Sequence, residues 1–193
     1  MYISGEIILE LEKKYGQPEE LSFAYEMTEL EFGVVRRSQK HGRAHDVTLF
    51  IIKDGRIVVI KKPMYPPGAY RAPSGGIAPG EPFEDGALRE AYEETGLVVS
   101  LEKYILRAKV RFSHGSGVIN WTSHVFTASS IGSDLQPIDT HEIAEARFVT
   151  VDELMGSIKD ELLASGSTGL RYRSELNDSV MRRLIAQGLI DSH

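Results

Sequence analysis

The segment between Gly75 and Leu97 carries more acid than a solvent-exposed helix needs. A helix is expected from Phe83 to Thr95, with Arg89 as its only base and five acids: Glu84, Asp85, Glu90, Glu93 and Glu94. Like charges one turn apart destabilise a helix by about 0.2–0.5 kcal/mol per pair. A bound cation would remove that cost, so the composition raises the question of what positive partner the helix meets.

Three of these acids share one face of the helix. Each residue advances about 100° around the axis, so Glu90, Glu93 and Glu94 fall within about 100° of one another. Carboxylate oxygens are the ligands that Mg²⁺ prefers, and Mg²⁺ often binds substrate phosphates at the same time. The pattern indicates either a magnesium site for a phosphate-containing substrate or a solvated acidic face on a surface helix.

The spacing around the helix favours the magnesium site. A motif with defined spacings between its residues spans the loop and the helix. Its fixed positions are Gly75, Glu81, Arg89, Glu90, Glu93, Glu94, Gly96 and Leu97. This pattern resembles the Nudix box of the Nudix hydrolase family at every fixed position, and the resemblance extends over about residues 44–158. It implies an α+β fold, specifically an α/β/α sandwich with a mixed β-sheet. It also implies an enzyme that uses Mg²⁺, or Mn²⁺ in its place, to hydrolyse the pyrophosphate linkage of a nucleoside diphosphate derivative.

The resemblance assigns roles to residues of the box. Four residues are implied to hold the metal, Gly75 through its carbonyl oxygen and Glu90, Glu93 and Glu94 through their carboxylates. Arg89 and Glu81 are expected to form an ion pair that orients the loop against the helix. Pro82 stands where a serine or threonine N-cap would be favourable, so we expect proline at the first helical position to organise the turn instead.

Catalysis also needs a group that removes a proton from water. The residues expected to act in catalysis are Glu94, Glu142, Arg89 and Glu93. Glu94 or Glu142 is the expected base, and Glu145 stands behind Glu142 as the next acid along the chain.

Substrate contacts are harder to place from the sequence. The expected substrate-binding residues are Lys61, Arg71, Arg107 and Trp121. Arg107 shares a strand face with Lys109 and Arg111, a row that either meets phosphate or faces solvent. The aromatic rings of Tyr65, Tyr70, Phe112 and Trp121 either stack on a base or pack within the protein. ADP-ribose or a nucleotide sugar is the favoured substrate. The alternatives are a nucleoside triphosphate or dinucleoside polyphosphate, and a non-catalytic module that senses a nucleotide.

The elements that must position these residues follow from local patterns. Helical spacing and caps predict helices at residues 4–15, 28–39, 83–95, 150–163 and 175–187. Apolar runs and alternation predict strands at residues 21–27, 46–52, 57–63, 104–112, 118–127 and 145–150, the second and third joined as a hairpin. Residues 64–82 form a long loop rich in proline and glycine, which in a compact domain is usually functional.

Composition limits the remaining possibilities. The chain of 193 residues is expected to hold one domain at residues 44–193, preceded by a helix–strand–helix extension at residues 1–43 that packs on the core or forms a dimer contact. It contains no cysteine, which excludes thiolate catalysis and favours a cytoplasmic location. A net charge of −6 disfavours binding to a nucleic acid duplex. No apolar run reaches the ~20 residues of a membrane span. We therefore expect a small-molecule partner and consider a homodimer.

Overall fold

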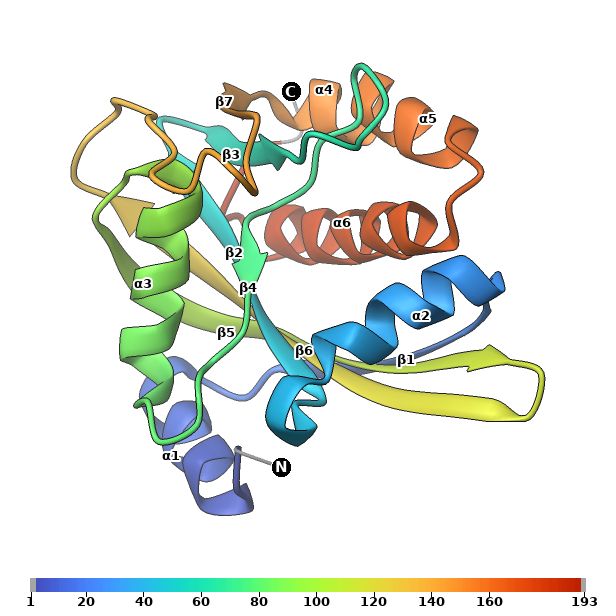
Figure 1. Ribbon diagram of the computed structural model, residues 1–193. Helices are drawn as coiled ribbons and strands as arrows, with labels where there is room; N and C mark the ends of the chain where they lie inside the picture. The colour runs from blue at the N-terminus through green and yellow to red at the C-terminus, as the bar shows by residue number, and fades with distance from the viewer. Residues whose placement is uncertain (1–2, 192–193) are drawn as a thin grey trace.

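The computed structural model describes residues 3–191 and shows a mixed β-sheet between two layers of helices (Figure 1). The helices are α1 (Gly5–Tyr15), α2 (Glu29–Ser38), the 3₁₀ turn η1 (Lys40–Gly42), α3 (Phe83–Thr95), α4 (Val151–Met155), α5 (Ser157–Ala164) and α6 (Thr168–Ala186). The strands are β1 (Glu19–Glu26), β2 (His45–Lys53), β3 (Arg56–Lys61), β4 (Ser74–Gly75), β5 (Val99–His114), β6 (Gly117–Ser130) and β7 (Glu145–Val149). None of the helices within residues 3–191 has both the length and the apolarity needed to cross a bilayer.

The seven-stranded sheet has the order β1-β5-β6-β2-β3-β7, with β4 added on β2. β5 and β6 form a long antiparallel hairpin, while β1 pairs parallel to β5 and β2 pairs parallel to β6. The N-terminal segment therefore contributes an edge strand to the same sheet. The predicted α+β class, with a mixed sheet in an α/β/α sandwich, is confirmed.

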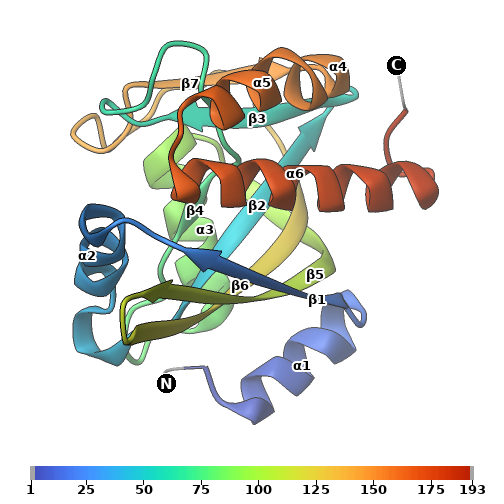
Figure 2. The same ribbon diagram turned by 90° about the vertical axis from the view of Figure 1, so that its right-hand side faces the viewer.

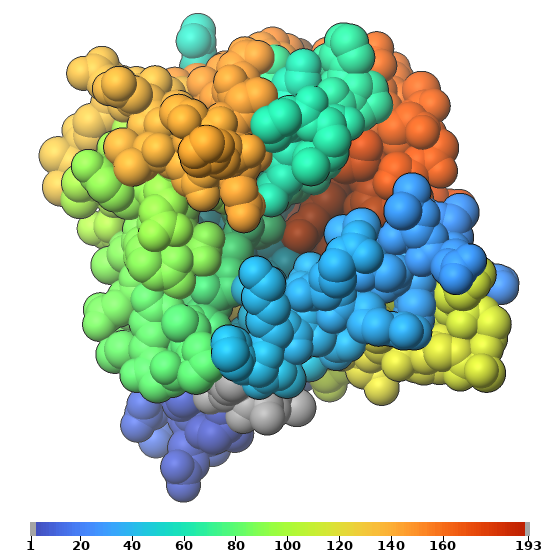
Figure 3. Space-filling model, viewed as in Figure 1, coloured from blue at the N-terminus to red at the C-terminus, as the bar shows by residue number. Residues whose placement is uncertain are grey.

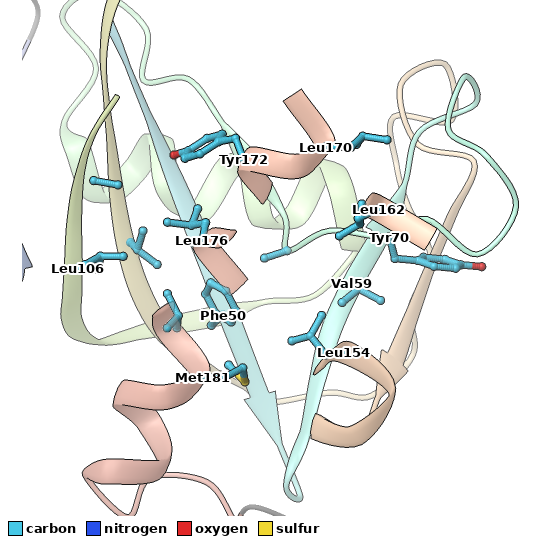
Figure 4. Close-up of a cluster of buried hydrophobic side chains, with 14 of the residues drawn as sticks. Phe50, Val59, Tyr70, Leu106, Leu154, Leu162, Leu170, Tyr172, Leu176 and Met181 are labelled. Atoms are coloured by element: carbon cyan, nitrogen blue, oxygen red, sulfur yellow. The ribbon is translucent and has the colours of Figure 1, made fainter. Parts of the chain in front are cut away.

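Helices cover both faces of the sheet. α1 and α3 pack on one face through an apolar cluster that includes Val47, Leu49 and Ile51 of β2. α2, α4, α5 and α6 cover the other face, where Phe50 of β2 packs with residues of α6 such as Leu176 (Figures 2 and 4). β2 is buried on both faces over most of its length, which agrees with the apolar run from Leu49 to Ile52. Burying one such side chain contributes about 1.5–3 kcal/mol.

The strands β2 and β3 diverge soon after their connecting turn. Only Ile52 and Lys53 of β2 pair with β3, because the chain from residue 71 to 75 inserts between the two strands farther on. There the Leu49 amide donates to the Pro73 carbonyl at 2.9 Å, and the Arg71 amide donates to the Ile60 carbonyl at 3.0 Å. The predicted hairpin is thus confirmed only at its turn. The inserted segment is the one that carries β4 to the centre of the molecule.

Three other local predictions are corrected. Gly156 breaks the predicted helix at residues 150–163 into α4 and α5. α6 begins at Thr168, earlier than predicted, because the Ser167 hydroxyl accepts from the Leu170 amide as an N-cap. Pro82 is the N-cap of α3, with φ −56° and ψ 139°, and not its first helical residue. In the first two cases a glycine or an N-cap outweighs the apolar spacing.

Candidate active site

Arg89 fastens the acidic helix α3 to the loop that precedes it. Its Nε and Nη2 donate to the two carboxylate oxygens of Glu81 at 2.8 and 3.0 Å, and Nη2 also donates to the Gly76 carbonyl at 3.0 Å. Glu81 in turn accepts from the Ala78 amide at 2.8 Å. Two parallel bonds between a guanidinium and a carboxylate define both distance and orientation. The predicted ion pair is confirmed, and it holds the loop against the helix.

The same guanidinium draws two further carboxylates together. Arg89 Nη1 donates to Glu90 Oε1 at 2.9 Å and to Glu93 Oε2 at 3.0 Å. Two carboxylates of α3 therefore converge on one cationic group. Because like charges repel, this convergence requires a positive partner between them.

Gly75 allows the Glu90 side chain to lie against β4. A Cβ atom at Gly75 would lie 1.8 Å from Glu90 Oε2, closer than any real contact. The next residue, Gly76, donates its amide to Glu90 Oε1 at 3.2 Å. Only a residue without a side chain leaves room for this carboxylate at this point of β4.

Glu94 is buried at 5% relative exposure and points to the inserted segment. Its Oε2 accepts from the Ser74 amide at 2.7 Å, and its Oε1 accepts from Arg71 Nη2 at 3.2 Å. Burial raises the pKa of the Glu94 carboxyl, while the nearby Arg71 charge acts in the opposite direction. Burial raises the pKa of the Glu90 carboxyl as well. Burial therefore disfavours the ionised forms of Glu90 and Glu94, and a nearby cation stabilises them.

Arg71 lies beneath the site and is only 3% exposed. Besides Glu94, its guanidinium donates to the Ala72 carbonyl at 2.8 Å, to Ser74 Oγ at 2.7 Å and to Tyr65 Oη at 3.2 Å. With these partners Arg71 orients Glu94 and β4. Its place under the surface differs from the direct substrate contact expected from the sequence.

A cavity of about 590 Å³ opens above these groups, between α3 on one side and α2 with η1 on the other (Figure 3). Its acidic lining residues are Glu90, Glu93, Glu94, Asp139 and Glu142. Its basic lining residues include Arg37, Lys40, Arg43 and Lys62. One hollow therefore presents carboxylates and cations together. We call it the acidic cavity.

The structure brings most of the predicted metal and catalytic residues to this cavity. Gly75, Glu90, Glu93, Glu94 and Glu142 line it. Glu142 comes from the segment before β7, and its Oε2 accepts from Lys62 Nζ at 2.8 Å. The Glu142 side chain is 64% exposed. Glu145 instead accepts from Tyr70 Oη at 2.7 Å and does not line the cavity.

The predicted substrate-binding residues are dispersed. Arg107 forms ion pairs with Glu12 of α1 and Glu20 of β1 and does not line the acidic cavity. Lys61 does not line the cavity, although its neighbour Lys62 does. Trp121 lines a second cavity. The roles of Lys61, Arg107 and Trp121 in substrate binding stay predictions.

The basic wall of the cavity was not predicted. Arg37 lies in the last turn of α2, Lys40 lies in η1 and Arg43 follows η1. From the sequence, Arg37 and Lys40 are explained as cations that stabilise the carboxyl end of a helix by interacting with its dipole. Their position opposite α3 depends on the packing of α2 on the sheet.

Comparison with known proteins identifies the family. The NUDIX domain family matches residues 40–167. The chain belongs to the Nudix family. The match begins close to the domain boundary predicted at residue 44 and includes the whole acidic helix.

Individual Nudix relatives match less of the chain. An NAD-capped RNA hydrolase NudC from Chromobacterium violaceum is 29% identical over 115 residues, which cover 59% of this chain and 41% of the relative. An RNA pyrophosphohydrolase from Erythrobacter litoralis is 30% identical over 102 residues, 45% of this chain and 62% of the relative. The alignments thus span less than two thirds of either relative. A Nudix hydrolase structure from Nitrosomonas europaea has a TM-score of 0.50 at 20% identity, covering 73% of this chain and 91% of that one, which shows a shared fold.

Nudix hydrolases generally use a divalent metal, and the oxygen atoms of the acidic cavity are its candidate ligands. Within residues 3–191 no group of three or more His, Asp or Glu side chains is arranged closely enough to hold a metal ion. The guanidinium of Arg89 nevertheless already bridges Glu90 and Glu93. Gly75 leaves the space that Glu90 needs, and all the donors are hard oxygens. The donor set fits a divalent cation, provided that Arg89 Nη1 yields its place between the two carboxylates.

Proposed function

We propose that this Nudix protein is a hydrolase that cleaves the pyrophosphate linkage of a nucleoside diphosphate derivative in a reaction that depends on Mg²⁺, or on Mn²⁺ in its place. The observation that carries the proposal is the acidic cavity, where the α3 carboxylates and the cations of Arg37, Arg43 and Lys62 line one hollow. A pyrophosphate is attracted by the cations and repelled by bare carboxylates. Metal and substrate therefore belong to the site together.

Each group has a defined task in this proposal. Glu90, Glu93, Glu94 and the Gly75 carbonyl would hold the divalent cation. When bound, such a cation neutralises charge on the phosphate oxygens and makes the attacking water more acidic. Arg71 orients Glu94 from beneath the site, and Arg89 holds the loop against α3 through Glu81.

Proton removal is the task we assign to Glu142. Its carboxylate lines the cavity and is 64% exposed, whereas both oxygens of Glu94 are already hydrogen bonded. The Lys62 ammonium donates to the Glu142 carboxylate and holds it at the cavity. Glu94 remains the alternative base.

For the substrate we favour ADP-ribose or a nucleotide sugar. The names of the two relatives, an NAD-capped RNA hydrolase and an RNA pyrophosphohydrolase, support a phosphoanhydride next to a nucleoside and bring RNA ends into the set of candidates. The alternatives are nucleoside triphosphates and dinucleoside polyphosphates. A module that senses a nucleotide without cleaving it is the remaining alternative.

A screen of the purified protein tests the proposal. Nucleotide sugars, ADP-ribose, dinucleoside polyphosphates, nucleoside triphosphates and capped RNA would be incubated with Mg²⁺, and phosphate released by an added phosphatase would be measured. Glu94→Gln is the inactivating variant. Glu84→Gln is its matched control, because Glu84 lies on the same helix, pairs with Lys14 and does not line the cavity.

The outcomes separate the candidate functions. Turnover that disappears with EDTA and in Glu94→Gln, and survives in Glu84→Gln, supports the proposal and names the substrate. Mg²⁺-dependent nucleotide binding without any turnover would overturn the hydrolase and leave the sensing module.

A further inference from the structure

A second cavity of about 470 Å³ adjoins the acidic cavity. Val34 and Ser38 of α2 line both hollows, so the two meet at α2. We call the second one the aromatic cavity, because four rings are part of its lining, those of Tyr65, Phe112, Trp121 and Tyr172. The lining of the aromatic cavity is thus largely aromatic and apolar, whereas that of the acidic cavity is largely charged.

Two walls of the aromatic cavity come from elements outside the matched Nudix residues 40–167. α2 contributes Val34 and Val35, and α6 contributes Leu170 and Tyr172. The Glu31 carboxylate of α2 ties the two helices together, since its Oε1 accepts from Ser167 Oγ at 2.9 Å and from the Thr168 amide at 2.7 Å. The cavity therefore lies between the matched Nudix region, which contributes Tyr65, Phe112 and Trp121, and two helices outside it.

A cation stands at the junction of the two cavities. Arg43 lines the acidic cavity, and its guanidinium carbon lies 5.6 Å from the centre of the Trp121 ring. Its Nε donates to the Ser38 carbonyl at 3.1 Å, which fixes it beside the residue shared by both cavities. A ligand that crosses the junction would meet a positive charge next to an aromatic face.

The aromatic cavity also has a polar end. Arg173 Nη2 donates to Asp46 Oδ2 at 3.0 Å, and both residues line the cavity. The Asp46 side chain is 7% exposed, and its Oδ1 has no hydrogen-bond partner among residues 3–191. A buried acceptor without a partner is costly, and Arg173 Nη2 satisfies only one of the two Asp46 carboxylate oxygens.

We propose that the aromatic cavity binds the base of the nucleotide whose phosphates lie in the acidic cavity. The cavity's volume lies within the range of small-ligand sites, and aromatic side chains are the usual partners of nucleobases because every base has a flat π-face. The phosphate half of this assignment rests on the proposed function, and the base half rests on the cavity itself. Val34, Trp121 and Gly169 are then residues that determine specificity.

Trp121 makes the assignment measurable, because it is the only tryptophan in the chain. Two uncleavable probes are compared by Trp fluorescence in the presence of Mg²⁺: α,β-methylene-ADP, and methylenediphosphonate, which has the same phosphorus skeleton without adenosine. We expect the nucleotide analogue to quench Trp121 and to bind at least tenfold more tightly. Equal affinities and equal spectra for the two probes would overturn the proposal.

Gly169 supplies a variant that blocks the cavity without disturbing the fold. It lies in the first turn of α6 and lines the cavity, and a Cβ there would meet only Ser167 Oγ, at 3.7 Å. Leucine is also a better helix former than glycine. Gly169→Leu should raise the dissociation constant of α,β-methylene-ADP tenfold or more and change that of methylenediphosphonate less than twofold. Gly5→Leu, in the first turn of α1 with no atom within 4 Å, is the matched control.

The results distinguish this assignment from the proposed function. If the nucleotide quenches the fluorescence, Gly169→Leu abolishes this quenching and the protein shows no hydrolytic activity, the base site is supported and the hydrolase is rejected. Hydrolysis with an unchanged KM in Gly169→Leu rejects the base site and supports the hydrolase. Binding of another apolar group of the substrate, with no preference for the nucleotide probe, also rejects the base site.

Discussion

Replacing Gly75 with alanine tests the geometry of the acidic cavity at one atom. The new Cβ would lie 1.8 Å from Glu90 Oε2, whereas ordinary contact begins at 3.4 Å, so the carboxylate must move by about 1.6 Å. A misplacement of about 1 Å in an active site can reduce activity about 100-fold. We therefore expect kcat/KM to fall at least about 100-fold, equivalent to about 2.7 kcal/mol of transition-state stabilisation.

The same substitution should leave the fold almost unchanged. The backbone of Gly75 is outside the left-handed region, and the clash is with the end of a flexible side chain. Alanine also restricts the unfolded chain, which stabilises the folded state by about 0.4–1 kcal/mol. The free energy of unfolding should thus change by less than about 1 kcal/mol.

Two measurements on each variant check this reasoning. Steady-state kinetics over a range of Mg²⁺ concentrations gives kcat/KM, and urea denaturation gives the free energy of unfolding. Gly132→Ala is the control, because a Cβ there has no neighbour within 4 Å. A folded Gly75→Ala protein with activity within threefold of the wild type would refute the placement of Glu90. Loss of both activity and fold would mean that Gly75 has a structural role instead.

Three further predictions concern proton transfer, a buried ion pair and acid stability. Glu142→Gln should lower kcat about 10²- to 10⁴-fold with an unchanged urea midpoint. A kcat equal to that of the wild type, with an unchanged acidic limb of the pH–rate profile, would leave Glu94 as the base. Arg71→Met should destabilise the protein by about 3–5 kcal/mol because it leaves the buried Glu94 charge unpaired, and adding Glu94→Met should restore much of the loss in urea denaturation; no recovery would argue against the pair. Burial lowers the pKa of His124 to about 3, so below pH 6.5 the unfolded chain binds a proton that the folded chain excludes, and the free energy of unfolding should fall as the pH drops towards 3. At pH 5 this contribution is about 2 kcal/mol, and urea denaturation at pH 7 and pH 5 should show a smaller decrease for His124→Gln than for the wild type; equal decreases would contradict it.

The acidic helix shows how far local sequence reaches. The bounds Phe83–Thr95 follow from apolar spacing and from Gly96, which adopts the left-handed conformation at φ 75° that glycine tolerates best. The shared helix face of Glu90, Glu93 and Glu94 follows from the helical repeat alone. The pair between Arg89 and Glu81 lies within the same loop and helix. All of these depend on neighbours close in the chain.

The partners of the other charged residues depended on the tertiary structure. Arg107 and Arg71 are both cations flanked by apolar residues in the sequence, and nothing local distinguishes them. Packing places Arg107 against Glu12 of α1 and Arg71 under Glu94 of α3. Such choices are made by long-range contacts, which residue type and periodicity do not encode.

The sequence by itself therefore determined the family, the sandwich class and the carboxylate face of the site, because a helix repeat and a box of fixed spacing are local properties. Only the tertiary structure decided what surrounds that face. The insertion of β4 between β2 and β3, the basic wall from Arg37 to Arg43, and the tie from Glu31 to Ser167 bring together segments distant in the chain. Their meeting depends on how apolar surfaces of whole elements pack.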